Sequence, residues 1–473
     1  MSRGGLLGKI VGFSMVSVVS AVLSLVVVPV STHLYDQDAL GKINFFFSVT
    51  NVLLTLFCLG LDQGYVRFYP LAKDEGQRRR LLTFSVSACL CVVVAAGLVA
   101  WAFDDSLSVW LFGEAGMPAT AMICLVTLCV VALRFFSLRY RMAEDVWGYT
   151  IFAGAVSVIQ KGLYIVSAVV STSYVVAVGW VALACLPILV AAAAHERAQL
   201  AAPDLRGEAS LYCDEARFSL PLLASGLVAI LTNYVPQFAI RSLIGFSNIS
   251  VFTAALTVSL AVNLIQSGFN AFWAPYVYQH ARDEQGKIMR VHEAVVMVAV
   301  SACMLLAMIV DLAFLLFKPN YAAGARLVPF LALGPLCYTI GETAGVGINL
   351  KMKSGLNLLI SAATLASSVA LSLALVPVLG LGGGAVSVGG AAAVGLALKT
   401  AIGEHYYQSI RDRSFMLRGL LPYVAVCVVA LALPDRLALR LAIDAALLVL
   451  SLALYGPSRL RALAGYLKSF VGR

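Results

Sequence analysis

Fourteen stretches of about 20 mainly apolar residues run along this chain, and they limit its fold more than any other feature. A helix needs about 20 apolar residues to cross a hydrocarbon core roughly 30 Å thick. Only 12% of the 473 residues are charged and 61% are hydrophobic, whereas a soluble protein carries about 25% charged residues. The sequence therefore predicts an all-α polytopic membrane protein. The predicted spans are 9–31, 42–64, 81–103, 118–139, 147–170, 174–194, 217–241, 248–276, 291–316, 327–350, 355–378, 383–403, 418–433 and 437–456.

The positions of the 33 Lys and Arg residues predict the orientation of these spans. With the N-terminus in the cytoplasm, and with residues towards a span end counted with the adjacent loop, six of them lie outside, Lys161 lies near the middle of a span, and the remaining 26 lie inside. This asymmetry follows the positive-inside rule and predicts cytoplasmic N- and C-termini. It also explains the net charge of +9 without a nucleic-acid partner. The first apolar stretch has no small-residue cleavage site and is expected to be a retained helix.

Short loops and missing motifs argue against an enzyme. No loop is longer than about 20 residues, so no soluble domain is expected, and no GxxxxGK[ST] motif is present to bind nucleotide phosphates. The ten cysteines form no CxxC pair and the five histidines are dispersed, so we expect neither a metal site nor a disulfide framework. The chain is therefore expected to be a transporter or channel, with no cofactor beyond a coupling ion such as H⁺ or Na⁺.

A weak internal repeat indicates two lobes. At an offset of 207 residues, Pro29 matches Pro236 and Phe45 matches Phe252. Six predicted spans separate the copies, so both have the same orientation, as in transporters built from parallel repeats. We expect an N-terminal lobe over 1–200, a cytoplasmic linker over 201–215, a C-terminal lobe over 216–405, and two further helices with a cytoplasmic tail over 406–473.

Three stretches carry a family resemblance. They are "PVSTHLYDQDALGKINFFFSVTNVLLTLFCLGLDQGYVRFYP" at 29–70, "FNAFWAPYVY" at 269–278 and "LVPVLGLGGGA" at 375–385. Together they resemble helix ends and turns of the polysaccharide transporter family, the O-antigen and related lipid-linked oligosaccharide flippases. That family belongs to the multidrug/oligosaccharidyl-lipid/polysaccharide (MOP) exporter superfamily. The chain departs from the family pattern at Pro236-Gln237, where members often have Asp-Arg, and at Ser372, where Asn is frequent.

The resemblance implies a flippase of the bacterial inner membrane. Such a protein moves an undecaprenyl-diphosphate-linked oligosaccharide, a repeat unit of O-antigen or exopolysaccharide, from the cytoplasmic to the outer leaflet. The implied mechanism is alternating access between two six-helix lobes in a V-shaped arrangement. The implied partners are membrane lipids and other polysaccharide-assembly proteins. Since no ATPase motif is present, an ion gradient, the membrane potential or consumption of the product outside would supply the energy.

Two groups of amide side chains are candidates for lining a sugar-binding cavity. Asn233 and Gln237 lie one turn apart in the span 217–241, and Asn263, Gln266 and Asn270 have the spacing of one helix face in the span 248–276. Amides suit sugar hydroxyls because they both donate and accept hydrogen bonds. The alternative is that they join helices within the membrane. The aromatic residues that follow Asn270 are expected to anchor this helix at the membrane interface.

Three charged residues are further candidates. Lys161 lies near the middle of its span, where a charge is costly and indicates a function; it either binds the diphosphate or pairs with a carboxylate such as Glu342. Glu342 is that partner, a protonatable coupling site or a buried neutral acid. Arg67 either meets the diphosphate headgroup on its approach or is an ordinary anchor paired with Asp62.

Rival functions remain open. A drug/cation antiporter of the same superfamily would be favoured by acids in the middle of the first span, but "IVGFSMVSVVSAVLSLVVV" contains none. A membrane enzyme of polysaccharide synthesis would carry a catalytic cluster, which the sequence does not show. A scaffold of a synthesis complex is the third alternative, and a transport assay separates it from the others.

Overall fold

The chain folds into helices alone over the part that the structure describes. This computed structural model describes residues 3–204, 207–263, 266, 269, 273, 276–277, 283–351, 353–434, 436–457, 459 and 461. The side chains of residues 3–18 and 354 are not part of the description. Within these ranges the structure has eighteen α-helices and three short 3₁₀ helices, η1 (Tyr69–Leu71), η2 (Arg197–Gln199) and η3 (Pro319–Leu327), and no strand. The expected all-α class is therefore confirmed.

The chain divides into two compact units, and the boundary along the sequence falls between Tyr234 and Val235. The first unit contains α1 (Arg3–Leu34), α2 (Gln37–Phe57), α3 (Leu61–Phe68), α4 (Glu75–Trp101), α5 (Asp104–Phe112), α6 (Ala119–Met142), α7 (Val146–Lys161), α8 (Leu163–Ser167), α9 (Tyr174–Glu196) and most of α10 (Ala209–Ile244). The second contains α11 (Phe246–Ser259), α13 (Gln285–Phe314), α14 (Val328–Ala344), α15 (Val346–Leu350), α16 (Ser354–Leu379), α17 (Leu381–Tyr406), α18 (Arg413–Ala432) and α19 (Leu437–Tyr455).

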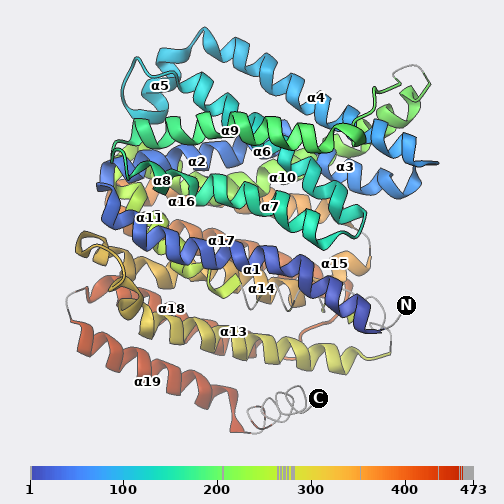
Figure 1. Cartoon of the computed structure of the whole chain (residues 1–473). Coiled ribbons are helices and arrows are strands. Elements are labelled where there is room, and N and C mark those ends of the chain that lie inside the picture. The colour runs from blue at the N-terminus through green and yellow to red at the C-terminus, as the bar shows by residue number, and fades with distance from the viewer. Residues whose placement is uncertain are drawn as a thin grey trace. The chain divides into compact units, whose positions relative to one another are not determined.

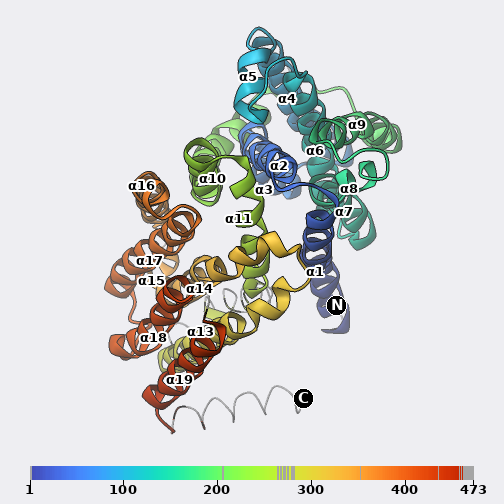
Figure 2. The ribbon, with the colours of Figure 1, turned by 90° about the vertical axis from the view of Figure 1, so that its left-hand side faces the viewer.

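Each unit is built around one deeply buried helix. In the first unit α6 packs against α2, α4, α7 and α9, which run alongside it (Figure 1). Apart from three arginines in its second half, its sequence is mainly apolar around the whole helix, as expected for a helix enclosed by others. In the second unit α14 has the same position: it packs between α13 and α17, and α16 covers the other side of α17 (Figure 2).

Each of the fourteen predicted spans overlaps one or two α-helices over its described residues, and eleven described helices are long and apolar enough to cross a membrane. The apolar parts Val19–Leu34 of α1 and Phe246–Ser259 of α11 are shorter. The predicted span 147–170 is divided into α7 and α8 at Gly162. α10 begins at Ala209, within the stretch predicted as a linker, and its 36 residues extend over about 54 Å at 1.5 Å per residue. The predicted lobe boundaries stay predictions.

A left-handed turn breaks the second predicted span. Leu59 and Gly60 have φ values of 53° and 71°, which end α2 and start α3. A Cβ added at Gly60 would collide with the backbone carbonyl of Ser219 in α10. Glycine is therefore needed here for two reasons, the backbone conformation and the close approach of α10.

We expect Gly60→Ala to lower the free energy of unfolding by about 3 kcal/mol or more, because strain and collision add. Gly116→Ala is the matched control, since Gly116 also has a positive φ (83°) but nothing within 4 Å of an added Cβ; it should cost about 1 kcal/mol. Thermal unfolding of the purified protein measures both. Equal losses for the two variants would contradict the close packing of α3 on α10.

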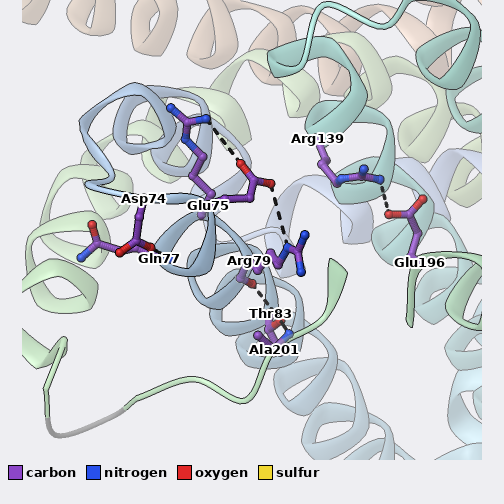
Figure 3. A network of polar contacts seen from close by, with 9 residues as sticks. Asp74, Glu75, Gln77, Arg79, Thr83, Arg139, Glu196 and Ala201 are labelled. Atoms are coloured by element: carbon purple, nitrogen blue, oxygen red, sulfur yellow. Dashed lines mark hydrogen bonds and ion pairs between the residues drawn. The ribbon is translucent and has the colours of Figure 1, made fainter. Parts of the chain in front are cut away.

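Polar contacts tie the helix ends of the first unit together (Figure 3). The Asp74 carboxylate caps α4 by accepting from the Gln77 amide at 2.7 Å, an arrangement that stabilises helix starts. Glu75 pairs with Arg79 at 4.0 Å. Further along, Arg139 of α6 pairs with Glu196 of α9 (Figure 3). The contacts of Asp74 and Glu75 stabilise the start of α4, and the Arg139–Glu196 pair connects α6 to α9 at the side that the charge distribution predicts to be cytoplasmic.

A second set of polar contacts surrounds Glu114, in the loop between α5 and α6. Lys42 Nζ lies 2.6 Å from one carboxylate oxygen, and the Tyr174 hydroxyl donates to the other at 2.9 Å. The hydrogen bond from Lys42, with a second from Tyr174, lowers the pKa of Glu114.

A carboxyl group whose pKa falls on folding stabilises the fold above its unfolded pKa, about 4.3 for Glu, and this contribution disappears as the pH drops through the folded pKa. We therefore expect the melting temperature of the wild type to fall more steeply from about pH 5 to about pH 3 than that of Glu114→Gln. Melting curves across this range are the measurement. If the melting temperatures of the two proteins change with pH in parallel, the contacts of Lys42 and Tyr174 with Glu114 contribute nothing to stability.

Candidate functional site

Lys161 is the last residue of α7, and its ammonium group contacts α1. Nζ lies 2.8 Å from Ser20 Oγ and 3.4 Å from the Ser20 carbonyl oxygen. The side chain is half-buried. Across the described part of the chain no carboxylate lies within ion-pair distance of Lys161. Among the described residues, the ammonium group therefore has Ser20 as its hydrogen-bond partner and no counter-ion.

Gln160, the residue before Lys161, forms an amide pair with Asn51 of α2. Gln160 Nε2 donates to Asn51 Oδ1 at 3.1 Å, and Asn51 Nδ2 donates to the Phe47 carbonyl at 2.8 Å. This pair joins α7 to α2, just as the Lys161–Ser20 contact joins α7 to α1. We call Ser20, Asn51, Gln160 and Lys161 the Lys161 cluster. The sequence analysis missed Ser20, Asn51 and Gln160, although the two amides lie in predicted spans.

Arg67 in α3 is exposed and makes no ion pair within the described ranges. Asp62, five residues earlier, pairs instead with Arg134 of α6 at 3.1 Å and accepts from Gln63 at 3.0 Å. The alternative in which Asp62 holds Arg67 is therefore wrong. Like Lys161, Arg67 is a cation of the first unit that makes no ion pair with a carboxylate among the described residues.

The predicted amides differ in accessibility. Asn233, in the first unit, is exposed and donates to the Ala229 carbonyl of its own helix at 3.2 Å. Gln237 is buried, Asn263 is exposed and Gln266 is half-buried. Asn270 lies outside the described residues. Lining of a cavity by these side chains stays a prediction.

Glu342 of α14 has a cation partner, Lys399 of α17, at 2.6 Å. The Lys399 stem lies against Gly345, where an added Cβ would come within 2.6 Å of its Cε. The Trp273 indole donates to the Glu342 carbonyl oxygen at 3.1 Å. Within its own unit each candidate therefore has another partner, Lys399 for Glu342 and Ser20 for Lys161, and the suggested pairing of Glu342 with Lys161 stays a prediction. The sequence analysis did not single out Lys399, which lies within the predicted span 383–403.

The described aromatic residues near Trp273 build a core. Trp273 is 3% exposed and its ring stacks with Phe269 at a centroid distance of 5.3 Å. It packs with Ile288 of α13 and Val346 of α15. The expectation of an interfacial anchor is wrong for Trp273, because its indole is enclosed beside the Glu342–Lys399 pair.

With this architecture the chain is a multi-pass membrane protein of helical-bundle units. Its structure is similar to that of the lipid II flippase MurJ in an inward closed conformation, with a TM-score of 0.67, 13% identity, and coverage of 94% of this chain and 98% of the other. It is also similar to inward- and outward-facing conformations of a multidrug resistance MATE family transporter of the MOP superfamily. These have TM-scores of 0.52 and 0.53 at 16% identity, cover 86% and 84% of this chain, and are themselves each covered to 94%.

These likenesses show a MurJ- and MATE-like transporter fold. The sequence matches no protein-family model and no curated protein. Substrate and mechanism must therefore be argued from the residues of this chain.

Proposed function

We propose that this protein is a flippase that moves a polyprenyl-diphosphate-linked oligosaccharide from the cytoplasmic to the outer leaflet of a bacterial inner membrane. The fold that it shares with a lipid II flippase and the stretches that resemble the polysaccharide transporter family support this proposal. An O-antigen or exopolysaccharide repeat unit, carried on undecaprenyl diphosphate, is the proposed substrate. Alternating access is the proposed mechanism.

The observation that carries the proposal is the Lys161 cluster. A diphosphate entering a hydrocarbon-spanning bundle needs cationic hydrogen-bond donors, because charge-assisted bonds are about twice as strong as neutral ones. Lys161 has a serine and no described carboxylate beside it, so it can take the diphosphate without first breaking an ion pair. Arg67 is the proposed first contact on the approach, and its planar guanidinium suits bidentate phosphate binding.

The amides complete the proposed site. Asn233, Gln237, Asn263, Gln266 and Asn270 are the proposed contacts for sugar hydroxyls, and Asn51 and Gln160 of the Lys161 cluster have the same chemistry. Glu342 is the proposed coupling residue. Protonation of Glu342 would break its ion pair with Lys399, because a neutral carboxyl no longer attracts the ammonium group.

Translocation of a fluorescent polyprenyl-diphosphate oligosaccharide in proteoliposomes tests the proposal. Flipping in excess of that in protein-free vesicles is expected, and an imposed proton or sodium gradient should change its rate. Absence of flipping across several glycans and both gradients would overturn the proposal.

A drug/cation antiporter is the second candidate function, favoured by the similarity to the MATE family transporter. The same vesicles distinguish it: uptake of an organic cation driven by an outward proton or sodium gradient, without flipping of the lipid-linked substrate, would favour antiport.

A further inference from the structure

A carboxylic acid that belongs neither to the Lys161 cluster nor to the Glu342–Lys399 ion pair is buried in the first unit. Glu215 of α10 is fully buried. Ser85 of α4 donates to its Oε1 at 2.9 Å. Its other oxygen, Oε2, has no hydrogen-bond partner among the described residues. An enclosed carboxylate oxygen without a donor is unusual and needs an explanation.

The surroundings of Glu215 are tightly packed. A Cβ added at Gly64 of α3 would come within 2.9 Å of Glu215 Cγ. One turn further along α10, the Ser219 hydroxyl donates to the Glu215 carbonyl at 2.7 Å. Since Gly60 also approaches the Ser219 backbone, α3 and α10 are in contact over two turns. The carboxyl group is therefore enclosed by the packing of α10 on α3 and α4.

Within the part of the chain that the structure describes, Glu215 makes no ion pair. Two basic residues of α4 and α6 have other partners: Arg80 pairs with Glu208 at 2.6 Å, and Arg134 pairs with Asp62. The hydrogen bond from Arg80 lowers the pKa of Glu208, just before α10, and keeps that carboxylate ionised.

Among the described residues, a phenol and a thiol interact electrostatically with Glu215. They belong to Tyr65 of α3 and Cys89 of α4, and both side chains are normally neutral near pH 7. An ionised Glu215 in this place would have one hydroxyl donor and no counter-charge, which costs several kcal/mol. A protonated Glu215 is neutral and escapes that cost.

We infer that Glu215 is a proton-binding site that holds the first turns of α10 against α3 and α4 when it is protonated and releases them when it ionises. On release, Glu215 gives its proton to water and the carboxylate becomes hydrated; on closure it takes a proton back from water. α10 is continuous from Ala209 to Ile244 and connects the two units. The idea that a proton gradient acts on transport through Glu215 rests on the proposed function. The pH dependence of the contact between α10 and its neighbours does not.

Hydrogen–deuterium exchange of the full chain in lipid nanodiscs tests the inference without any transport substrate. The readout is protection of the backbone amides of residues 209–219, corrected for the chemical exchange rate at each pH. Between about pH 5.5 and about pH 8.5, protection in the wild type should fall roughly tenfold or more, the change that 1.4 kcal/mol produces. Glu215→Gln, whose side chain is neutral at both pH values, should stay protected throughout.

Two further variants make the result specific. Asp214→Asn changes an exposed acid on the same helix and should behave as the wild type does. Ser85→Ala removes the one donor to the carboxylate, disfavours ionisation, and should move the loss of protection to higher pH. If Glu215→Gln does not fold, the shift expected for Ser85→Ala still tests the inference. Protection that is independent of pH in the wild type, or a loss that persists in Glu215→Gln, overturns the inference and leaves the flippase proposal standing.

Discussion

Replacement of Lys161 by alanine should lower the rate of flipping of the lipid-linked oligosaccharide by roughly 10- to 100-fold, while the protein stays folded. A hydrogen bond to a charged group contributes about 1.5–3 kcal/mol, and each 1.4 kcal/mol corresponds to a factor of about ten. The fold should tolerate the change, because Ser20 is the hydrogen-bond partner of the Lys161 ammonium among the described residues. Lys161→Arg retains a cation and should keep much of the activity.

Two controls separate phosphate binding from a structural role. Ser20→Ala removes the partner of Lys161 but keeps its charge, so flipping should continue. Lys287→Ala removes a lysine that pairs with Glu284 at 2.5 Å on the surface of the second unit, and should also leave flipping unchanged. If Ser20→Ala abolished transport as fully as Lys161→Ala, the contact between α1 and α7 would be what matters. If Lys161→Ala flipped at the wild-type rate, Arg67 would become the next candidate.

The fold could be predicted from the sequence because a membrane span is a local property. About 20 apolar residues suffice to define one, and each predicted span overlaps one or two α-helices over its described residues. The breaks at Gly60, Gly162 and Gly345 could not be predicted in the same way, because the apolar run continues across each of them. At Gly60 the reason is a tertiary contact, the approach of Ser219 from a helix some 160 residues away.

The charged candidates were visible for the same local reason, and their partners were not. Lys161 and Glu342 interrupt apolar runs, so an ionisable group at either position calls for an explanation. Their partners come from other helices: Ser20 is 141 residues from Lys161, and Lys399 is 57 residues from Glu342. Glu215 was missed because it lies just before the predicted span 217–241, where an acid reads as part of a hydrated loop.

The Glu342–Lys399 pair should show strong coupling in a double-mutant cycle. The side chains are 23% and 19% exposed, so removal of either partner leaves a largely buried charge uncompensated, which costs about 3 kcal/mol or more. We expect Glu342→Gln and Lys399→Met each to lower the free energy of unfolding by about this amount, and the double variant to lose less than the sum. Unfolding in mixed micelles provides the free energies.

The surface pair Lys287–Glu284, treated identically, should show a coupling below about 1 kcal/mol. Additive losses at Glu342 and Lys399 would mean that the pair contributes nothing to stability. The stable double variant then distinguishes the two roles of Glu342. If the pair only joins α14 to α17, flipping and its response to an ion gradient should recover together with stability. If Glu342 couples transport to an ion, the double variant should fold and bind the lipid-linked substrate but no longer respond to the gradient, because no titratable carboxylate remains at that position.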